Sequence, residues 1–355
     1  MLFRSYRYGG EIRLLRAPAA LPAPLEGFAE GLQVPGAEGW RLERRLGFAG
    51  DTWLCRHTGG ERRVFKFAAE GERLGQLKRE LTVHRLLRQG LGDDAPVARI
   101  VGWQFDVGPG HLQLEHLPEG SLAEWLPAQG GAAAVPLAWR LSLAADIARG
   151  VAAAHALGVL HKDLKPSNVL VRPRPGGQPP QMLLADFGVA QLLDDQGLRH
   201  WGITRLGFTQ KIDASHSGTP AYLAPEVSAG ELPTTRSDIY ACGVMLFQLV
   251  VGDLRRPLAP GWEREVDDPL LREDIAAAAD VDPRHRLGDA RLLAERLEQL
   301  PQRRAALAAE AQRRQAAERT LQALARSRRR RNLLDRKSTR LNSSHEWISR
   351  MPSSA

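Results

Sequence analysis

The sequence is poor in cysteine and has no long apolar stretch. Its two cysteines, Cys55 and Cys242, lie far apart and without the spacing of metal ligands. We therefore expect them to be packing residues, which excludes a disulfide framework. The longest apolar segment, Tyr240 to Val251, is interrupted by Gly243 and Gln248 and is too short to span a bilayer, so it predicts a buried helix.

The N-terminus also lacks a secretory signal, because its charged residues, Arg4, Arg7, Glu11 and Arg13, are not followed by an apolar run. We therefore expect a cytoplasmic protein. A content of 43% hydrophobic and 25% charged residues is typical of a globular chain, and 355 residues suit one large domain or two lobes.

The net charge of +8 comes from one end of the chain. Residues 301–340 hold 13 Lys or Arg against 3 Asp or Glu, a surplus of 10, which leaves the other 315 residues at about −2. The rest of the chain is therefore nearly neutral, so the overall charge does not indicate a nucleic-acid surface.

The chain divides into segments of different composition. Residues 1–38 are rich in Pro, Ala and Gly and are predicted to be a poorly structured leader. From residue 39 to about 116, short β-type runs surround one helical stretch, Leu74 to Arg88. From 117 to about 300, long helical periodicity predicts a larger helical lobe, interrupted by an exposed hairpin insertion, Arg172 to Gln181. The pattern predicts an α+β fold.

A basic tail follows. Residues 301–334 are predicted to be a basic helical linker, with a helix over Ala305 to Arg331 that has few large apolar residues to bury. The next string, Asp335 to His345, lacks periodicity, and its back-translation matches the adapter of a common sequencing library. We therefore expect residues 335–355 to be translated adapter and the natural protein to continue beyond Leu334.

Three motifs succeed one another in the larger lobe. They are His161-Lys162-Asp163-Leu164-Lys165-Pro166-Ser167-Asn168, then Asp186-Phe187-Gly188, then Ala224-Pro225-Glu226. From about Trp40 to Leu300, the chain resembles the eukaryotic-like (Hanks-type) serine/threonine protein kinases of bacteria. The resemblance implies the bilobal protein kinase fold, with a small antiparallel β-sheet N-lobe (about 39–116) and a mainly helical C-lobe (about 117–300).

The resemblance also implies transfer of the ATP γ-phosphate to serine or threonine hydroxyls of proteins, including autophosphorylation. Asp163 would accept the proton of the acceptor hydroxyl, and Lys165 would neutralise the transferred phosphate. Asn168 and Asp186 would bind Mg²⁺ through the hard oxygen ligands that this ion prefers.

The smaller lobe is expected to bind the nucleotide. Lys66 lies in a β-type run and matches the family's third-strand lysine, which is expected to contact the α- and β-phosphates of ATP. Glu80, on the first helix, matches the ion-pair partner of that lysine. The two residues are closer in sequence than is typical of the family, so the loop into the helix must be short.

The nucleotide loop, Leu46 to Leu54, departs most from the family pattern. Only Gly47 falls on a family glycine, and Ala49 and Thr52 stand at the other two positions. Backbone amides must approach the phosphates closely there, and we expect Gly50 to compensate in part.

Leu114, Glu115 and Leu117 resemble the hinge between the lobes. The backbone of Glu115 and Leu117 would hydrogen-bond adenine, and Leu114 would limit the back of the pocket.

The activation segment, Asp186 to Glu226, contains Gly218-Thr219-Pro220-Ala221-Tyr222, which is similar to the substrate-docking loop of serine/threonine kinases. Thr219 and Lys165 argue against tyrosine as the acceptor.

Two further residues are expected to have structural roles. Arg286 would brace Glu226, and Asp238 would anchor the catalytic loop from its helix.

Lys162 replaces the arginine that precedes the catalytic aspartate in members activated by loop phosphorylation. An ammonium lacks the bidentate fork that suits phosphate, so this mode of activation stays open. The candidate autophosphorylation sites are Thr204, Thr209, Ser215 and Ser217.

Two other classes of protein compete with this interpretation. The altered nucleotide loop favours a nucleotide-binding pseudokinase scaffold, whereas the presence of Asp163, Asn168, Asp186 and Lys66 opposes it. A small-molecule phosphotransferase shares the ancestral lobes, but that class lacks a docking loop like Gly218 to Glu226.

We expect protein substrates and no nucleic-acid partner, because no aromatic interleaving accompanies the basic run Arg328 to Arg331. This run fits a solvated helix end, a nucleic-acid patch or a cytoplasmic juxtamembrane cluster. We favour the last, since positive charge collects on the cytoplasmic side of membrane spans. Leu333 and Leu334 would then begin a missing C-terminal segment that attaches the protein to the membrane.

Overall fold

The computed structural model describes residues 6–8, 11–13, 28–46, 51–193 and 220–348. The chain forms two compact units, residues 1–298 and residues 299–355.

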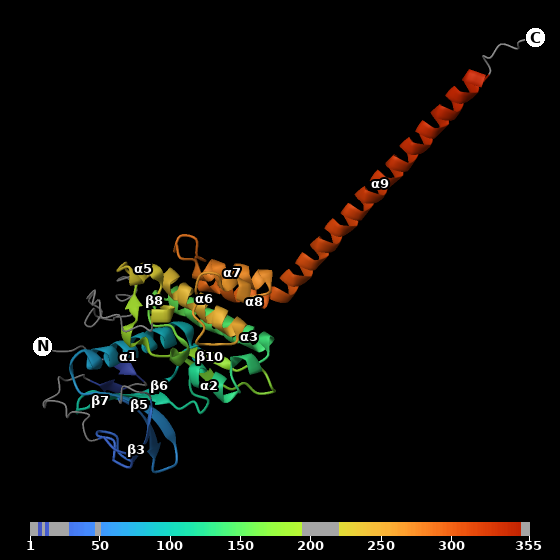
Figure 1. Cartoon of the computed structure of the whole chain (residues 1–355). Coiled ribbons are helices and arrows are strands. Elements are labelled where there is room, and N and C mark those ends of the chain that lie inside the picture. The colour runs from blue at the N-terminus through green and yellow to red at the C-terminus, as the bar shows by residue number, and fades with distance from the viewer. Residues whose placement is uncertain (1–5, 9–10, 14–27, 47–50, 194–219, 349–355) are drawn as a thin grey trace, which may run out of the picture. The chain divides into compact units, whose positions relative to one another are not determined.

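A five-stranded antiparallel sheet forms the smaller lobe of the first unit (Figure 1). Its sequence order is β3 (Trp40–Leu46), β4 (Thr52–His57), β5 (Arg62–Ala68), β6 (Ile100–Gln104) and β7 (Gly110–Glu115), and its spatial order is β3-β4-β5-β7-β6. Side chains alternate between the two faces, so β5 directs the buried Phe65 and Phe67 to one face and Lys66 to the other. A separate hairpin pairs β1 (Tyr6–Tyr8) with β2 (Glu11–Arg13).

One helix, α1 (Gly71–Leu91), packs on the sheet face opposite to Phe65 and Phe67. Its Leu77 and Leu81 join an apolar cluster with residues of β6 and β7. The helix includes the predicted stretch, Leu74 to Arg88, and extends it by three residues at each end. It begins after a link of two residues, Ala69 and Glu70, which confirms the predicted short connection.

The other sheet face is covered by residues 28–38, so the predicted start of the folded part at residue 39 is too late. Val34 is 1% exposed and belongs to the same apolar cluster as Phe67. The Phe28 ring packs edge-on against the Phe67 ring, with centroids 5.0 Å apart. The sheet has large apolar side chains on both faces and α1 covers only one, so a second covering segment is needed.

Helices make up most of the larger lobe, as predicted. They are α2 (Leu122–Ala128), α3 (Leu137–Ala156), α5 (Pro225–Ser228), α6 (Thr235–Val251), α7 (Pro269–Ala279) and α8 (Ala290–Glu298). The longest apolar segment lies in α6, which is buried over most of its length. Cys242 on α6 and Cys55 on β4 are both buried and free, which confirms that they are packing residues.

Short strands and single 3-10 turns connect these helices. β8 (Val159–Leu160) pairs with β11 (Gln191–Leu192), and β9 (Val169–Arg172) pairs with β10 (Gln181–Leu184). The 3-10 turns are η1 (Ala132–Ala134), η2 (Pro166–Asn168), η3 (Phe187–Val189), η4 (Pro220–Tyr222) and η5 (Trp262–Glu265).

The β9–β10 hairpin confirms the predicted insertion. Its loop is largely exposed. Arg174 in this loop contacts the buried Asp146 of α3, with Nη2 and Oδ2 2.9 Å apart, so the loop is fastened to the helical core.

The described residues of the second unit form the helix α9 (Leu300–Ile348). It includes the predicted helix, Ala305 to Arg331, and continues through residues 335–348, the segment interpreted as translated adapter. No Gly or Pro occurs from Gln302 to Ile348, so no strong helix breaker interrupts it. Within the part of the chain that the structure describes, no helix is long and apolar enough to cross a membrane.

Candidate active site

A buried ionic cluster joins the sheet to α1. Lys66 Nζ lies 2.8 Å from Glu80 Oε1 and 3.4 Å from Asp186 Oδ1. Burial lowers the pKa of Lys66, but the carboxylates of Glu80 and Asp186 outweigh this effect, so the pKa lies above its usual 10.5. The Lys66 ammonium is therefore held in its charged form.

Local sequence explains the position of Glu80. Leu77 lies three residues before it and His84 four residues after it, on the same face of α1, and both side chains are buried. The two-residue link after β5 leaves the helix little freedom to shift along the sheet. The predicted Lys66–Glu80 ion pair is present as a result.

Asp163, Lys165 and Asn168 converge between β8 and β9. Asp163 Oδ2 accepts hydrogen bonds from Lys165 Nζ at 2.8 Å and from Asn168 Nδ2 at 3.0 Å. Asn168 Nδ2 also donates to the Asp163 carbonyl at 2.8 Å. The amide nitrogen of Asn168 is thus engaged, which leaves its Oδ1 as the atom suited to a cation.

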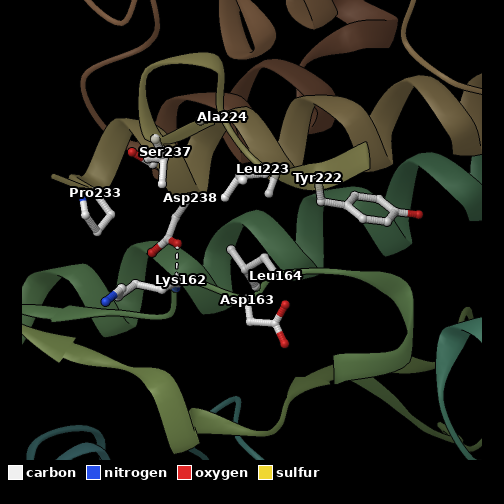
Figure 2. Close-up of a pocket in the computed structure, with 11 residues that line it drawn as sticks. Lys162, Asp163, Leu164, Tyr222, Leu223, Ala224, Pro233, Ser237 and Asp238 are labelled. Atoms are coloured by element: carbon white, nitrogen blue, oxygen red, sulfur yellow. Dashed lines mark hydrogen bonds between the residues drawn. The ribbon is translucent and has the colours of Figure 1, made fainter. Parts of the chain in front are cut away.

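Asp238 of α6 anchors this loop, as the sequence predicted (Figure 2). Its Oδ2 accepts from the His161 N–H and its Oδ1 from the Lys162 N–H, both at 2.9 Å. Lys162 has a φ of 71°, which is uncommon for a residue with a side chain. The ionised acceptor stabilises this backbone conformation.

His161 connects the loop that holds Asp163 to the segment that holds Asp186. The Asp163 N–H donates to His161 Nδ1 at 3.4 Å, so the ring proton lies on Nε2, which donates to the Ala185 carbonyl at 2.9 Å. Burial lowers the pKa of His161, which favours this neutral form. The His161 ring also contacts Phe187, with ring centroids 4.7 Å apart.

Asp186 adopts a left-handed conformation, with φ 64° and ψ 61°. The Ala185 N–H donates to the Asn168 carbonyl at 2.9 Å, which holds the Asn168 and Asp186 segments together. Lys66 lowers the pKa of Asp186, so this carboxylate is ionised. On the α1 side, Arg79 donates to the Gly188 carbonyl at 2.8 Å.

The predicted hinge begins at the end of β7. Leu114 is buried, and the Leu117 carbonyl accepts from the Gly120 N–H at 3.0 Å, which closes a turn. Glu115 Oε1 accepts from Arg172 Nη2 at 2.6 Å. Arg172 ends β9 in the larger lobe, so an ion pair braces the hinge.

Glu226 and Arg286 form the predicted brace. Two parallel contacts of 2.7 Å join Nη1 to Oε1 and Nη2 to Oε2, and Arg286 is 3% exposed. Ser237 Oγ donates to Glu226 Oε1 at 3.0 Å. These bonds fix the end of the activation segment to α6.

A pocket lies beside Asp163, between Leu164 and the segment that leads into α5 and α6 (Figure 2). Leu223, Ala224 and Pro233 give it apolar walls. Tyr222 OH donates to the buried Gln248 Oε1 at 2.8 Å, which fixes this side of the pocket.

Some predicted site residues lie outside the described residues. They are Gly47 and Gly50 of the nucleotide loop, Gly218 and Thr219 of the docking loop, and the candidate phosphorylation sites Thr204, Thr209, Ser215 and Ser217.

Comparison with known proteins decides the family. The model of the protein kinase domain matches residues 55–327. The chain belongs to the protein kinase family. Membership implies the use of ATP and a divalent metal ion, and the antiparallel sheet with α1 and the helical lobe form the bilobal fold of this family.

Relatives of this kinase occur in bacteria and animals. Serine/threonine-protein kinase PkaA of Streptomyces coelicolor is 43% identical over 126 residues, covering 35% of this chain and 20% of PkaA. Serine/threonine-protein kinase Pkn1 of Myxococcus xanthus is 32% identical over 227 residues, covering 61% of this chain and 29% of Pkn1. Human dual specificity testis-specific protein kinase 1 is 30% identical over 225 residues, covering 62% of this chain and 32% of the human protein. The kinase thus spans only a fifth to a third of these relatives' length.

Two contacts of this kinase's site have no signal in the sequence. Arg79 and Gly188 are 109 positions apart, and Arg172 and Glu115 are 57 apart. The residues next to Arg79 and Arg172 in the sequence are equally compatible with arginines that are solvated at the surface.

Proposed function

We propose that this kinase transfers the γ-phosphate of ATP to serine and threonine hydroxyls of proteins, its own included. The observation that carries the proposal is the ionic cluster of Lys66, Glu80 and Asp186 next to the hydrogen-bonded group of Asp163 and Asn168. Phosphoryl transfer depends on positioning and on neutralising charge, and both demands are met by groups held in place by their neighbours.

Asp163 is the proposed proton acceptor. The acceptor hydroxyl oxygen bonds to the γ-phosphorus, the bond from phosphorus to the leaving ADP oxygen breaks, and the hydroxyl proton passes to Asp163. Lys165 and Asn168 both donate to Oδ2, so we assign the proton to Oδ1. Lys165 also neutralises the phosphate in transfer.

Lys66 is proposed to contact the α- and β-phosphates, with Glu80 aiming its ammonium. The backbone of Gly47 and Gly50 would approach the same phosphates. Adenine would bind the backbone of Glu115 and Leu117, against Leu114.

Asn168 and Asp186 fit a magnesium ion through the chemistry of their oxygens. Asn168 Nδ2 is engaged with Asp163, which leaves Oδ1 free of that role, and Asp186 is ionised beside Lys66. Mg²⁺, when bound, would neutralise phosphate charge. Asn168 and Asp186 would hold the ion through their side-chain oxygens.

Serine or threonine is proposed over tyrosine because of Lys165 and Thr219. The two bacterial relatives are named as serine/threonine kinases, whereas the human relative is named as a dual specificity kinase. Direct identification of the labelled residue is therefore part of the test.

We further propose a kinase domain that ends near residue 300 and begins near residue 28, followed by a basic linker, 301–334, and translated adapter, 335–355. The two free cysteines support a reducing, cytoplasmic setting. The basic helix supports attachment to the inner face of a membrane through a segment beyond Leu334.

The test follows labelled γ-phosphate from ATP, with Mg²⁺, onto the full chain and a generic basic protein. Asp163→Ala is compared with Asp94→Ala, which removes an exposed aspartate. Label on serine or threonine that disappears only in Asp163→Ala supports the proposal. Nucleotide binding without transfer in the wild type would indicate a pseudokinase scaffold, and label on small molecules alone would indicate another phosphotransferase.

A further inference from the structure

A second ion pair joins α1 to the sheet. Arg73, in the first turn of α1, places Nη2 2.6 Å from Asp51 Oδ2. The Asp51 side chain is 12% exposed and that of Arg73 39%. Asp51 immediately precedes β4, so the pair links the helix to the strand that follows the predicted nucleotide loop.

Asp51 is itself fixed beside the Lys66 strand. Its carbonyl accepts from the Phe67 N–H at 2.7 Å, and its Oδ1 accepts from Thr52 Oγ1 at 3.2 Å. Thr52 pairs with Lys66 in the β4–β5 register. A shift of Asp51 would therefore move the backbone next to Lys66.

Arg73 is fixed on the helix that holds Glu80. Its Nη1 donates to Gln76 Oε1 at 3.0 Å, one turn further along. The Arg73 Nε is buried and has no hydrogen-bond partner among the described residues. Hydrogen bonds within the fold therefore do not satisfy every donor of this guanidinium.

We propose that Arg73 and Asp51 are a positioning pair that holds the start of β4 against α1 and thereby strengthens the binding of ATP phosphates. The pair acts where Thr52 stands in place of a family glycine. A strand start that is already fixed loses less conformational entropy when nucleotide binds. The proposal rests on the proposed function for its ligand, ATP.

The experiment measures the Kd of Mg²⁺–ATP by calorimetry on the full chain, together with KM for ATP, kcat and Tm. Arg73→Ala and Asp51→Asn should each weaken ATP binding by about tenfold, as expected for loss of one charged hydrogen bond, with kcat at saturating ATP within about twofold. The double variant should bind no more weakly than either single variant.

Two further variants keep the test informative if a substitution impairs folding. Arg73→Lys retains the charge without the fork and should have an intermediate Kd. Arg88→Ala is the matched control, because Arg88 pairs with the exposed Asp93 at the other end of α1, and it should leave Kd unchanged.

Three outcomes would overturn the proposal. A weaker Kd in Arg73→Ala with no change in Asp51→Asn would mean that Arg73 contacts phosphate directly. A lower Tm with unchanged Kd would mean that the pair only stabilises the fold. A wild type that does not bind ATP would overturn both proposals, whereas ATP binding without transfer would overturn the kinase activity alone and leave the pair measurable by Kd.

Discussion

Lys66 and Glu80 are 14 positions apart in the chain, and their charged atoms lie 2.8 Å apart in the fold. The link of two residues between β5 and α1 makes this contact a consequence of the backbone path. The ammonium is therefore aimed by a helix that is fixed at its first turn and packed along its length.

Glu80→Gln should lower kcat/KM for ATP by roughly 10- to 100-fold, because the amide keeps the volume of the side chain but removes the charge that orients Lys66. Steady-state kinetics with a generic substrate checks this. Glu72→Gln, an exposed position on the same helix, is the control and should retain activity. Equal rates in both variants would contradict the assigned role of Glu80.

Asp238→Asn should lower the free energy of unfolding by about 3 kcal/mol and reduce transfer activity. The amide has one acceptor oxygen, so it cannot serve the His161 and Lys162 N–H groups as two ionised oxygens do. Urea unfolding followed by tryptophan fluorescence measures the loss. Asp253→Asn, at a half-exposed side chain, should change the free energy of unfolding little. A similar decrease in this free energy in both variants would refute the anchoring role of Asp238.

Arg286→Lys should destabilise the kinase by about 3 kcal/mol, since an ammonium cannot make two parallel bonds to the buried Glu226. Combining it with Glu226→Gln in a double-mutant cycle should show that the two losses are not additive. Chemical denaturation at pH 7 gives the coupling energy. Additive losses would mean that the two side chains act independently.

Acid should weaken the fold partly through His84. Its Nε2 accepts from the Ile100 N–H at 3.0 Å, and burial lowers its pKa from 6.5 to about 4. Between these values the unfolded state binds more protons, so this contribution to stability is complete above pH 6.5 and is lost as pH falls toward 4. The difference in pKa corresponds to about 3 kcal/mol.

His84→Gln keeps an acceptor for Ile100 but does not titrate. Its free energy of unfolding should therefore fall less than that of the wild type between pH 7 and pH 4, as measured by urea unfolding at several pH values. The buried His111, whose pKa is also lowered to about 4, should account for part of the remaining slope. Parallel curves for wild type and variant would show that His84 does not contribute.

Local sequence was enough to predict that Asp163, Lys165 and Asn168 come together and to predict the class of fold. Asp163, Lys165 and Asn168 lie within six positions of one another, so their proximity needs only one loop, and hydrophobic periodicity depends on near neighbours. Local sequence also predicted the presence of α1. It underestimated the length of this helix by about one turn at each end, because helix boundaries carry weak local signals.

Tertiary structure decided the contacts between distant segments. Residues 28–38 cover the face of the sheet that carries Phe65 and Phe67, which would otherwise be exposed. The amino-acid composition of residues 1–38 does not indicate this contact. The partners of Arg73, Arg79 and Arg172 depend on how the helix and the two lobes meet. The neighbouring residues in the sequence do not distinguish a solvated surface arginine from one that pairs with a distant segment. Only the packing of distant parts of the backbone gives the second kind of arginine its partner.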